Sequence, residues 1–433
     1  MNRSMRWLVL GLVAAGLAVS CQPKPKEVKI GVILPMSASG EMSSYARDIL
    51  NGIYMGVDDV GAKLGGTTIK IIEKDYAGDP ANLDRILKEL DQEGVIAVIG
   101  PVSSTDALAA KSIVNALALP AITPSATLNS VVEGSDYLWR VCASDKHMSQ
   151  AAAYVAGAEI LGLTEVAIVE QSGNPYSEEL SAGFKGFCDV ESLRVVKDVM
   201  KKPDEPICDA NTAKDIISAF KAPQEKTCVF VPMYYQDAAV VINELRAAGY
   251  KGIIIGGDGW DSKKLPEMVG ATSGTNYFIT HFFPGDVSVK AFVDKYRNKY
   301  QEEPSAFSAL GYDAFMVIYN ALSKTQSVTR EALKEQFQFV SFEGATGKIE
   351  FGKEHEPNAL NSVVVQLRDG KLSFFKKLSL SPYRGAGQPA EETEETPTET
   401  PPQEKDVGPG GKQVEPGGKK VGEGGNNPSG GGK

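Results

Sequence analysis

The amino-acid sequence predicts an α/β protein of two lobes, each built on a doubly wound parallel sheet. The first observation is that short apolar runs alternate with segments whose apolar residues recur every three or four positions, which is typical of strand–helix–strand units. The second is that this alternation restarts near residue 147, so that two similar halves follow each other along the 433 residues. In such sheets, ligands bind where loops meet at the carboxyl ends of the strands.

The first half opens with a buried strand at residues 28–34. A helix over residues 45–60 follows, because Ile49, Ile53 and Val57 recur on one face. The same criteria predict, in order, a strand at 68–74, a helix from Leu83 to Leu90, a strand at 95–99, a helix at 107–117 and a strand at 121–123.

The second half repeats the pattern, beginning with a helix. Its predicted elements are helix 147–161, strand 166–170, helix 178–187, strand 193–199, helix 213–220, strand 228–231, helix 237–248 and strand 253–256. A ligand is therefore expected at the loops that follow the strands of both halves. These loops cover residues 36–44, 100–105, 123–129, 171–176, 232–236 and 256–260.

The N-terminal residues have the layout of a secretory signal. Arg3 and Arg6 precede an apolar stretch at residues 7–19. This stretch is shorter than the about 20 apolar residues that span a bilayer, so we expect residues 1–20 to be removed as a signal peptide. The small residues before Cys21 resemble the lipobox of bacterial lipoproteins, which predicts a lipid on Cys21 and a linker over 21–27. The alternative is an ordinary secretory signal that happens to contain a cysteine.

The other end of the chain has a different composition. Residues 385–433 contain no Ile, Leu, Met, Phe, Tyr or Trp and are rich in Gly, Pro, Glu, Thr and Lys. Such a segment cannot bury enough apolar surface to offset the entropy of ordering, so we expect a disordered tail. It is either a passive solvated tail or an arm that crosses a cell wall or contacts a partner.

Composition excludes several classes of protein. The net charge of −10 and pI near 5.1, without a basic stripe, argue against a nucleic-acid partner. No nucleophile elbow, phosphate loop or HExxH motif is present, and the three histidines have no ligand spacing, so we expect no enzyme activity, catalytic residue, metal or cofactor. Four cysteines follow Cys21, at positions 142, 188, 208 and 228. Paired and unpaired states of these four are both open.

The predicted ligand loops carry hydroxyl groups in the first half and a carboxylate in the second. Ser103, Ser104 and Thr105 follow the third strand and are expected to begin a helix, whose free N–H groups favour a carboxylate or another small anion. Ser125 and Thr127 lie in the neighbouring loop. Asp258, in GGDGW, follows a strand of the second half. From there it can pair with the ammonium group of a ligand that lies between the halves. Aromatic residues near the same loops can form walls around an apolar ligand: Tyr45, Tyr176, Tyr234, Tyr235, Trp260 and Phe307.

A series of motifs extends this interpretation. In order, they are VKIGVILPMS, YARDILNGIYMGVDDV, VIGPVSST, AITPSAT, NPYSEEL, FVPMYYQDAA and IIIGGDGW. Together they resemble the type I periplasmic binding proteins of branched-chain amino acid transporters, over residues 28 to about 380. The resemblance implies two doubly wound lobes that are joined by a three-strand hinge and close on a ligand. It implies a first lobe of 28–141 plus 282–357 and a second of 142–281 plus 358–384.

The resemblance also implies roles for single residues. Ser104 and Thr127, with the backbone near Ser125, match positions that bind the carboxylate of an amino acid. Asp258 matches an acidic position that pairs with its α-ammonium group. The remaining matches are aromatic or ligand-facing positions: Tyr45, Tyr176, Tyr234 and Phe307.

The function that the resemblance implies is that of an extracytoplasmic, lipid-anchored solute receptor. Its expected partners are a branched-chain or related amino acid, the membrane permease of an ABC transporter and, through Cys21, a membrane at its periplasmic face or at the cell surface, with the receptor itself a monomer. Alternatives keep the fold and change the role: a sensor that reports to a membrane receptor, a binder of an amide, urea or aromatic acid, or a structural envelope lipoprotein.

Overall fold

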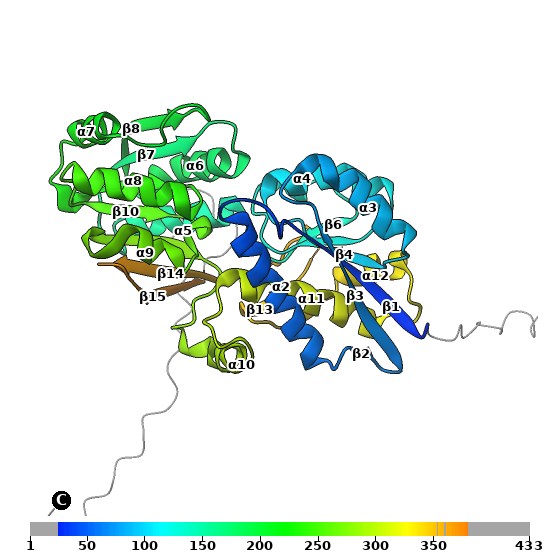
Figure 1. Ribbon diagram of the computed structural model, residues 1–433. Helices are drawn as coiled ribbons and strands as arrows, with labels where there is room; N and C mark the ends of the chain where they lie inside the picture. The colour runs from blue at the N-terminus through cyan, green and yellow to red at the C-terminus, as the bar shows by residue number, and fades with distance from the viewer. Residues whose placement is uncertain (1–24, 353, 359–360, 380–433) are drawn as a thin grey trace, which may run out of the picture. The chain divides into compact units, whose positions relative to one another are not determined.

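The computed structural model describes residues 25–352, 354–358 and 361–379, which form two sheets covered by helices (Figure 1). The predicted signal peptide, Cys21 and the tail at 385–433 lie outside the described residues. Among the helices that the structure describes, none has the length and apolar character needed to cross a membrane. The predicted α/β class with two parallel-sheet lobes is confirmed.

The first sheet has six strands in the order β2-β3-β1-β4-β5-β6. All neighbours pair in parallel except β2 and β3, which form an antiparallel ribbon at one edge. The strands are β1 (Glu27–Leu34), β2 (Lys63–Leu64), β3 (Thr67–Asp75), β4 (Ala97–Ile99), β5 (Ala121–Thr123) and β6 (Leu138–Arg140).

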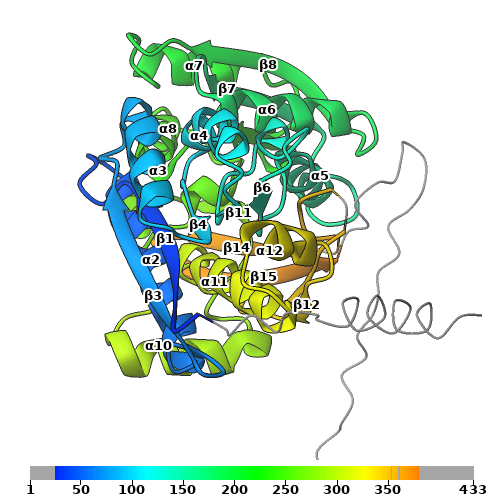
Figure 2. The same cartoon turned by 90° about the vertical axis from the view of Figure 1, so that its right-hand side faces the viewer.

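Helices cover both faces of this sheet because its central strand is apolar on both sides. Val28, Ile30 and Val32 of β1 pack with α2 and α11, which lie side by side (Figure 2). Ile33 points the other way and packs with α3 and α4. The helices of this half are α2 (Met42–Asp59), α3 (Leu83–Gln92), α4 (Ser104–Ala116), α10 (Lys290–Tyr300), α11 (Ala306–Lys324) and α12 (Arg330–Phe337).

The second sheet has seven strands in the order β15-β14-β11-β10-β9-β7-β8. Its five strands from β7 to β11 pair in parallel, and the hairpin of β14 and β15 adds an antiparallel edge. The strands are β7 (Glu165–Gln171), β8 (Arg194–Lys201), β9 (Thr227–Val231), β10 (Ile253–Gly256), β11 (Thr275–Thr280), β14 (Asn361–Arg368) and β15 (Lys371–Ser379).

The second sheet is also covered on both faces. Val229 and Val231 of β9 pack with α7 and α8, whereas Phe230 packs with α5 and α6 on the other side. The helices are α5 (Asp145–Ala156), α6 (Pro175–Cys188), α7 (Ala210–Ala219), α8 (Tyr235–Ala247) and α9 (Lys264–Val269). A separate two-strand ribbon joins β12 (Ser341–Glu343) to β13 (Lys348–Glu350).

The chain passes between the sheets three times: from β6 to α5, from β11 to α10 and from β13 to β14. These crossings are bonded to one another. The His281 ring nitrogen Nε2 accepts the Ala143 N–H at 3.0 Å, which joins the first crossing to the second. Arg140 donates through Nε to Glu356 at 2.8 Å, which joins the first crossing to the third. The residue bounds that were predicted for the two lobes stay a prediction.

Several expected elements differ in extent from those found. Helix α5 ends at Ala156, whereas the helix was predicted to reach residue 161, because Gly157 turns into an extended conformation although the apolar spacing continues. Helix α4 begins at Ser104, three residues before the predicted start at 107. Cys142, Cys188, Cys208 and Cys228 are buried free thiols, so the open question of pairing is answered by the unpaired state.

Candidate functional site

The candidate site is a cavity lined by residues that follow strands of both sheets and by residues of helices α2 and α11. All eight residues that were predicted to bind a ligand line it. The lining residues are Met42, Tyr45, Val102, Ser103, Ser104, Ser125, Thr127, Tyr176, Tyr234, Asp258, Gly259 and Phe307. The structure thus brings the predicted residues together, while their role in binding stays a prediction.

The start of α4 forms one side of the cavity. The Ser103 side chain caps the helix by accepting the Asp106 N–H at 3.1 Å and donates its own proton to the Asp106 carboxylate at 2.7 Å. The Ser104 hydroxyl accepts the Leu128 N–H at 3.3 Å, so its own proton remains available to a ligand. The first N–H groups of a helix have no partner inside the helix, so this side presents hydrogen-bond donors.

The loop after β5 adds further donors beside the helix. The Ser125 hydroxyl donates to the Val102 carbonyl at 2.9 Å, so its proton is occupied. The backbone N–H groups of Ser125 and Thr127, however, donate to no acceptor in the described part of the chain. Thr127 is buried, and its carbonyl accepts from Arg140 at 2.8 Å, which fixes the loop. A carboxylate placed here would accept from neutral donors of two adjacent loops.

Asp258 faces these donors from the second sheet. It opens the short 3-10 helix Asp258–Trp260 after β10 and is 5% exposed. The Tyr176 hydroxyl donates to its Oδ1 at 3.0 Å and accepts the Gly259 N–H at 3.1 Å. Burial raises the pKa of the Asp258 carboxyl from 3.8 to about 6, and the hydrogen bond from Tyr176 offsets this only in part. Because burial destabilises the ionised carboxylate, a cation that pairs with Asp258 in the cavity would stabilise it.

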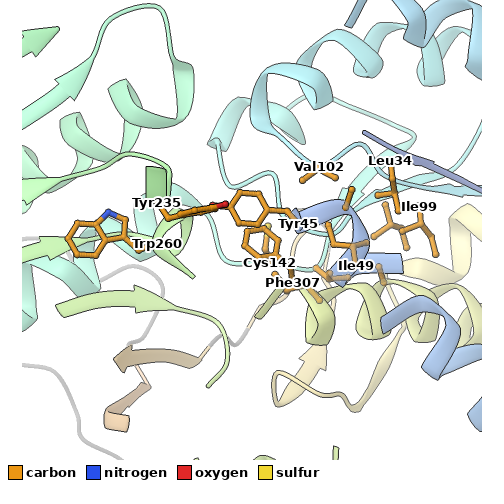
Figure 3. Packing of buried hydrophobic residues seen from close by; sticks show 14 of the residues in the cluster. Leu34, Tyr45, Ile49, Ile99, Val102, Cys142, Tyr235, Trp260 and Phe307 are labelled. Atoms are coloured by element: carbon orange, nitrogen blue, oxygen red, sulfur yellow. The ribbon is translucent and has the colours of Figure 1, made fainter. Parts of the chain in front are cut away.

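Aromatic rings form the walls between the two sides. Tyr45 stacks on Phe307, with ring centroids 4.0 Å apart, and meets the edge of Tyr235 (Figure 3). Tyr176 and Tyr234 stack at 5.1 Å. The Tyr45 hydroxyl donates to the Gly259 carbonyl at 2.7 Å, which links helix α2 of the first sheet to the loop after β10 of the second. Such rings suit an apolar ligand group.

The arrangement is suited to a molecule with a negative and a positive end. Donors without formal charge lie on one side, a carboxylate lies on the other, and no Lys, Arg or His is among the lining residues. Within the described residues, no group of His, Cys, Asp or Glu side chains could hold a metal ion. These groups are chemically complementary to the two charged ends of a zwitterion.

Sequence reasoning missed part of this site. Met42, Val102 and Gly259 line the cavity from loops that were expected to meet a ligand, but nothing in their residue types signalled a role. The aromatic residues Tyr235 and Trp260 were expected near these loops, yet they do not line the cavity. The Trp260 indole N–H instead donates to the Val231 carbonyl at 3.1 Å within the core.

Comparison with protein families gives one match that covers most of the chain. A family model described as "periplasmic binding protein" matches residues 27–371. Among curated proteins, the leucine-specific-binding protein of Salmonella typhimurium is 24% identical over 76% of this chain and 86% of its own length. The Leu/Ile/Val-binding protein of Escherichia coli K12 is 26% identical over 75% of this chain and 86% of its own length.

Solved structures show the same similarity. A leucine-binding protein from Thermotoga maritima has a TM-score of 0.74 at 28% identity and is matched over 81% of this chain and 99% of its own. A branched-chain amino acid transporter substrate-binding protein from Streptococcus pneumoniae, in complex with isoleucine, has a TM-score of 0.72 at 26% identity over 82% of this chain and 100% of its own.

Proposed function

Since this chain belongs to the periplasmic binding protein family, we propose that it binds an amino acid with an apolar side chain in the cavity between its two sheets. The relatives named above are binding proteins and not enzymes. We propose further that this chain delivers its ligand to the membrane permease of an ABC transporter. The names of its relatives, which include leucine-specific and Leu/Ile/Val-binding proteins, support this ligand class.

The observation that carries the proposal is the opposition of Ser104 and Asp258 across one cavity. The ligand carboxylate would accept hydrogen bonds from the start of α4 and from the loop at Ser125 and Thr127. The ligand ammonium would meet the Asp258 carboxylate, and the side chain would lie among the tyrosine and phenylalanine rings. A ligand with a second acidic group would find no cation in the lining to pair with it.

Binding is proposed to favour closure of the two lobes about the three crossings. A ligand held by donors of one lobe and by the carboxylate of the other stabilises only the arrangement in which both are near. The contact from Tyr45 to Gly259 and the Asn129 N–H that reaches Glu179 at 3.3 Å run between the same two parts of the chain. They would close the cavity over the bound ligand.

Isothermal titration calorimetry tests the ligand class. Leucine, isoleucine, valine, phenylalanine and alanine are titrated into protein that was unfolded, dialysed and refolded to remove carried ligand. We expect a dissociation constant of about 1 μM or below for at least one of them, which is on the order of −8 kcal/mol. Absence of heat with all five would refute an amino acid ligand and leave the fold assignment intact.

Mass spectrometry of the native protein identifies the ligand without a prior choice. Protein purified from its own host is denatured, and the released small molecules are compared with those from an Asp258→Ala variant. We expect an amino acid to be released from the unaltered protein and to be depleted in the variant. Release of a carboxylic acid without an amine would contradict the proposal.

The membrane anchor is proposed from the first residues alone. Replacement Cys21→Ser should leave amino acid affinity unchanged, because Cys21 is not among the residues that line the cavity, and should release the protein from the membrane fraction. A variant that stays in the membrane fraction would contradict a lipid anchor on Cys21.

A further inference from the structure

Asp145 is a buried carboxylate that the proposed site does not use. It is the first residue of α5, directly after the first crossing between the sheets, and its exposed fraction is 0%. Neither of its side-chain oxygens has a hydrogen-bond partner within the described residues. Burial of a carboxylate without a partner destabilises a folded protein, so a residue of this kind calls for an explanation.

The position of Asp145 is directly behind the cavity wall. Its backbone N–H donates to the Thr127 carbonyl at 2.8 Å, and Thr127 lines the cavity. Burial raises the pKa of the Asp145 carboxyl well above its ordinary value; the Thr127 hydroxyl lowers it, although without normal hydrogen-bond geometry. The negative charges of Asp258 and Glu179 raise this pKa further, and Arg140 lowers it.

Arg140 does not neutralise Asp145 by direct contact. Its Nη1 donates to the carbonyls of Thr127 and Leu128, each at 2.8 Å, and its Nε donates to Glu356. The region around the cavity therefore contains two buried carboxylates, Asp145 and Asp258, without a cation bonded to either of them. The group that is missing is a positive charge, which an amino acid ligand carries as its ammonium.

We infer that Asp145 is a further recognition residue, which acts with Asp258 on the ammonium group of the ligand and selects against ligands that have the carboxylate but no amine. This inference rests on the proposed function. It adds a specificity determinant from the crossing segment to a site otherwise built from loops after strands. It also explains why both Asp145 oxygens lack partners in the protein itself.

Asp313 provides a matched comparison for a structural role. It is also buried, with an exposed fraction of 0%. In contrast to Asp145, it accepts hydrogen bonds from the backbone N–H groups of Ala345 and Thr346, at 2.6 and 3.0 Å, and from the Thr346 hydroxyl at 2.6 Å. The Asp313 carboxylate is therefore fully engaged in holding the loop between β12 and β13. Neither Asp145 nor Asp313 is among the residues that line the cavity, but Asp145 is hydrogen-bonded through its backbone to Thr127, which does line it.

The test compares Asp145→Asn with Asp313→Asn by calorimetry, using leucine and 4-methylpentanoate, which has the leucine skeleton without the amine. Asp145→Asn should weaken leucine binding by roughly 10- to 100-fold, as expected when a negative charge within several ångströms of a buried ammonium group is removed. It should leave 4-methylpentanoate binding unchanged or stronger. Asp313→Asn should leave both affinities unchanged. Equal leucine affinity in Asp145→Asn and the unaltered protein would overturn the inference.

A second readout needs no ligand. The Tm of ligand-free Asp145→Asn at pH 7.5 should exceed that of the unaltered protein, because asparagine avoids the cost of either burying the charge of Asp145 or protonating it, whereas Asp313→Asn should lower the Tm. A lower Tm, or failure of Asp145→Asn to fold, would indicate a structural role and overturn the inference. If the unaltered protein binds leucine and only the variant behaves otherwise than expected, the proposed function survives. If the unaltered protein binds no amino acid, both fall together.

Discussion

The two sides of the cavity are chemically opposite although both are loops at the carboxyl ends of parallel strands. The side from the first sheet presents hydroxyl and backbone N–H donors of Ser104, Ser125 and Thr127 and carries no formal charge among the lining residues. The side from the second sheet presents the Asp258 carboxylate, supported by the Tyr176 hydroxyl. Segments that follow parallel strands in the two sheets thus have opposite hydrogen-bonding character.

This difference shows why neither half would suffice alone. Neutral donors at a helix start bind a carboxylate without a counter-charge, whereas a buried carboxylate needs a cation to offset its desolvation. Leaving the second side without a ligand therefore costs more free energy. Substitution of its carboxylate should reduce ligand affinity more than substitution of a donor on the first side. The predictions below test that ranking from the largest effect to the smallest.

Replacement Asp258→Ala removes the charge of the second side. We expect amino acid binding to weaken by about 2 to 5 kcal/mol, because the ligand ammonium would be buried without its partner. Calorimetry with leucine measures the change. Asp261→Asn serves as the control, since Asp261 is a buried acid three residues away that accepts from the Thr280 hydroxyl at 2.9 Å and does not line the cavity. Unchanged affinity in Asp258→Ala would sink the site assignment.

Replacement Ser104→Ala tests the first side. It removes a donor to the ligand carboxylate and the acceptor of the Leu128 N–H, so we expect a loss of about 1.5 to 3 kcal/mol in binding. Ser103→Ala is the matched control, because the Ser103 hydroxyl is occupied by Asp106. This control should lower stability by about 0.5 to 2 kcal/mol through loss of the helix cap, with little change in affinity. A loss of affinity in Ser103→Ala but not in Ser104→Ala would show that Ser103, and not Ser104, contacts the ligand.

Acidity should affect only the second side. The ligand ammonium pairs with the ionised form of Asp258, whose pKa in the empty cavity is raised to about 6. Affinity should therefore be constant above about pH 7 and fall as the pH drops through 6, with a loss of about ten-fold by pH 5. Leucine titrations from pH 5 to 8 measure this, and Asp258→Asn should flatten the profile. A pH-independent affinity in the unaltered protein would contradict an ionised Asp258 as the partner.

The contact that links the two sides directly should have the smallest effect. Tyr45→Phe removes the hydrogen bond to the Gly259 carbonyl and keeps the ring, so we expect a loss of about 0.5 to 1.5 kcal/mol in affinity. Tyr235→Phe is the control, because the Tyr235 hydroxyl is buried and has no hydrogen-bond partner in the described chain. The control should bind as tightly as the unaltered protein. Equal losses in both variants would show that the hydrogen bond from Tyr45 to Gly259 makes no specific contribution to affinity.

The fold could be predicted from sequence wherever a strand is buried on both faces. Strand β9 is a continuous buried run, and β1 is apolar from Ile30 to Leu34, while the helices that follow these strands repeat at the helical period. The prediction missed β6, because a three-residue strand that reads Leu-Trp-Arg has no recognisable period. The predicted helix extended beyond the end of α5, because Ile160 and Leu161 continue the apolar spacing after Gly157. Only the backbone conformation of Gly157 ends the helix there.

The site could be predicted at the level of loops but not of every side chain. Parallel sheets place the loops after their strands at one edge, so the lining loops followed from topology. Ser103 caps α4 and Ser104 offers its hydroxyl to the cavity because α4 begins at Ser104. The helix predicted from the sequence began three residues later, so these two roles could not be told apart. Asp145 gave no signal, because the absence of a hydrogen-bond partner is a property of packing and cannot be seen in a sequence.

The four buried thiols have a practical consequence for measuring motion. Burial raises the pKa of the Cys188 thiol to about 12 and that of Cys208 to about 11, and it raises the pKa values of Cys142 and Cys228 as well. Because a thiol reacts with maleimide dyes as its thiolate, these four should resist labelling in the native protein. A chain that starts after Cys21 and carries one new surface cysteine on each lobe could take a donor and an acceptor fluorophore with the native cysteines left in place. Energy transfer between the two dyes would then report the opening and closing of single molecules in real time.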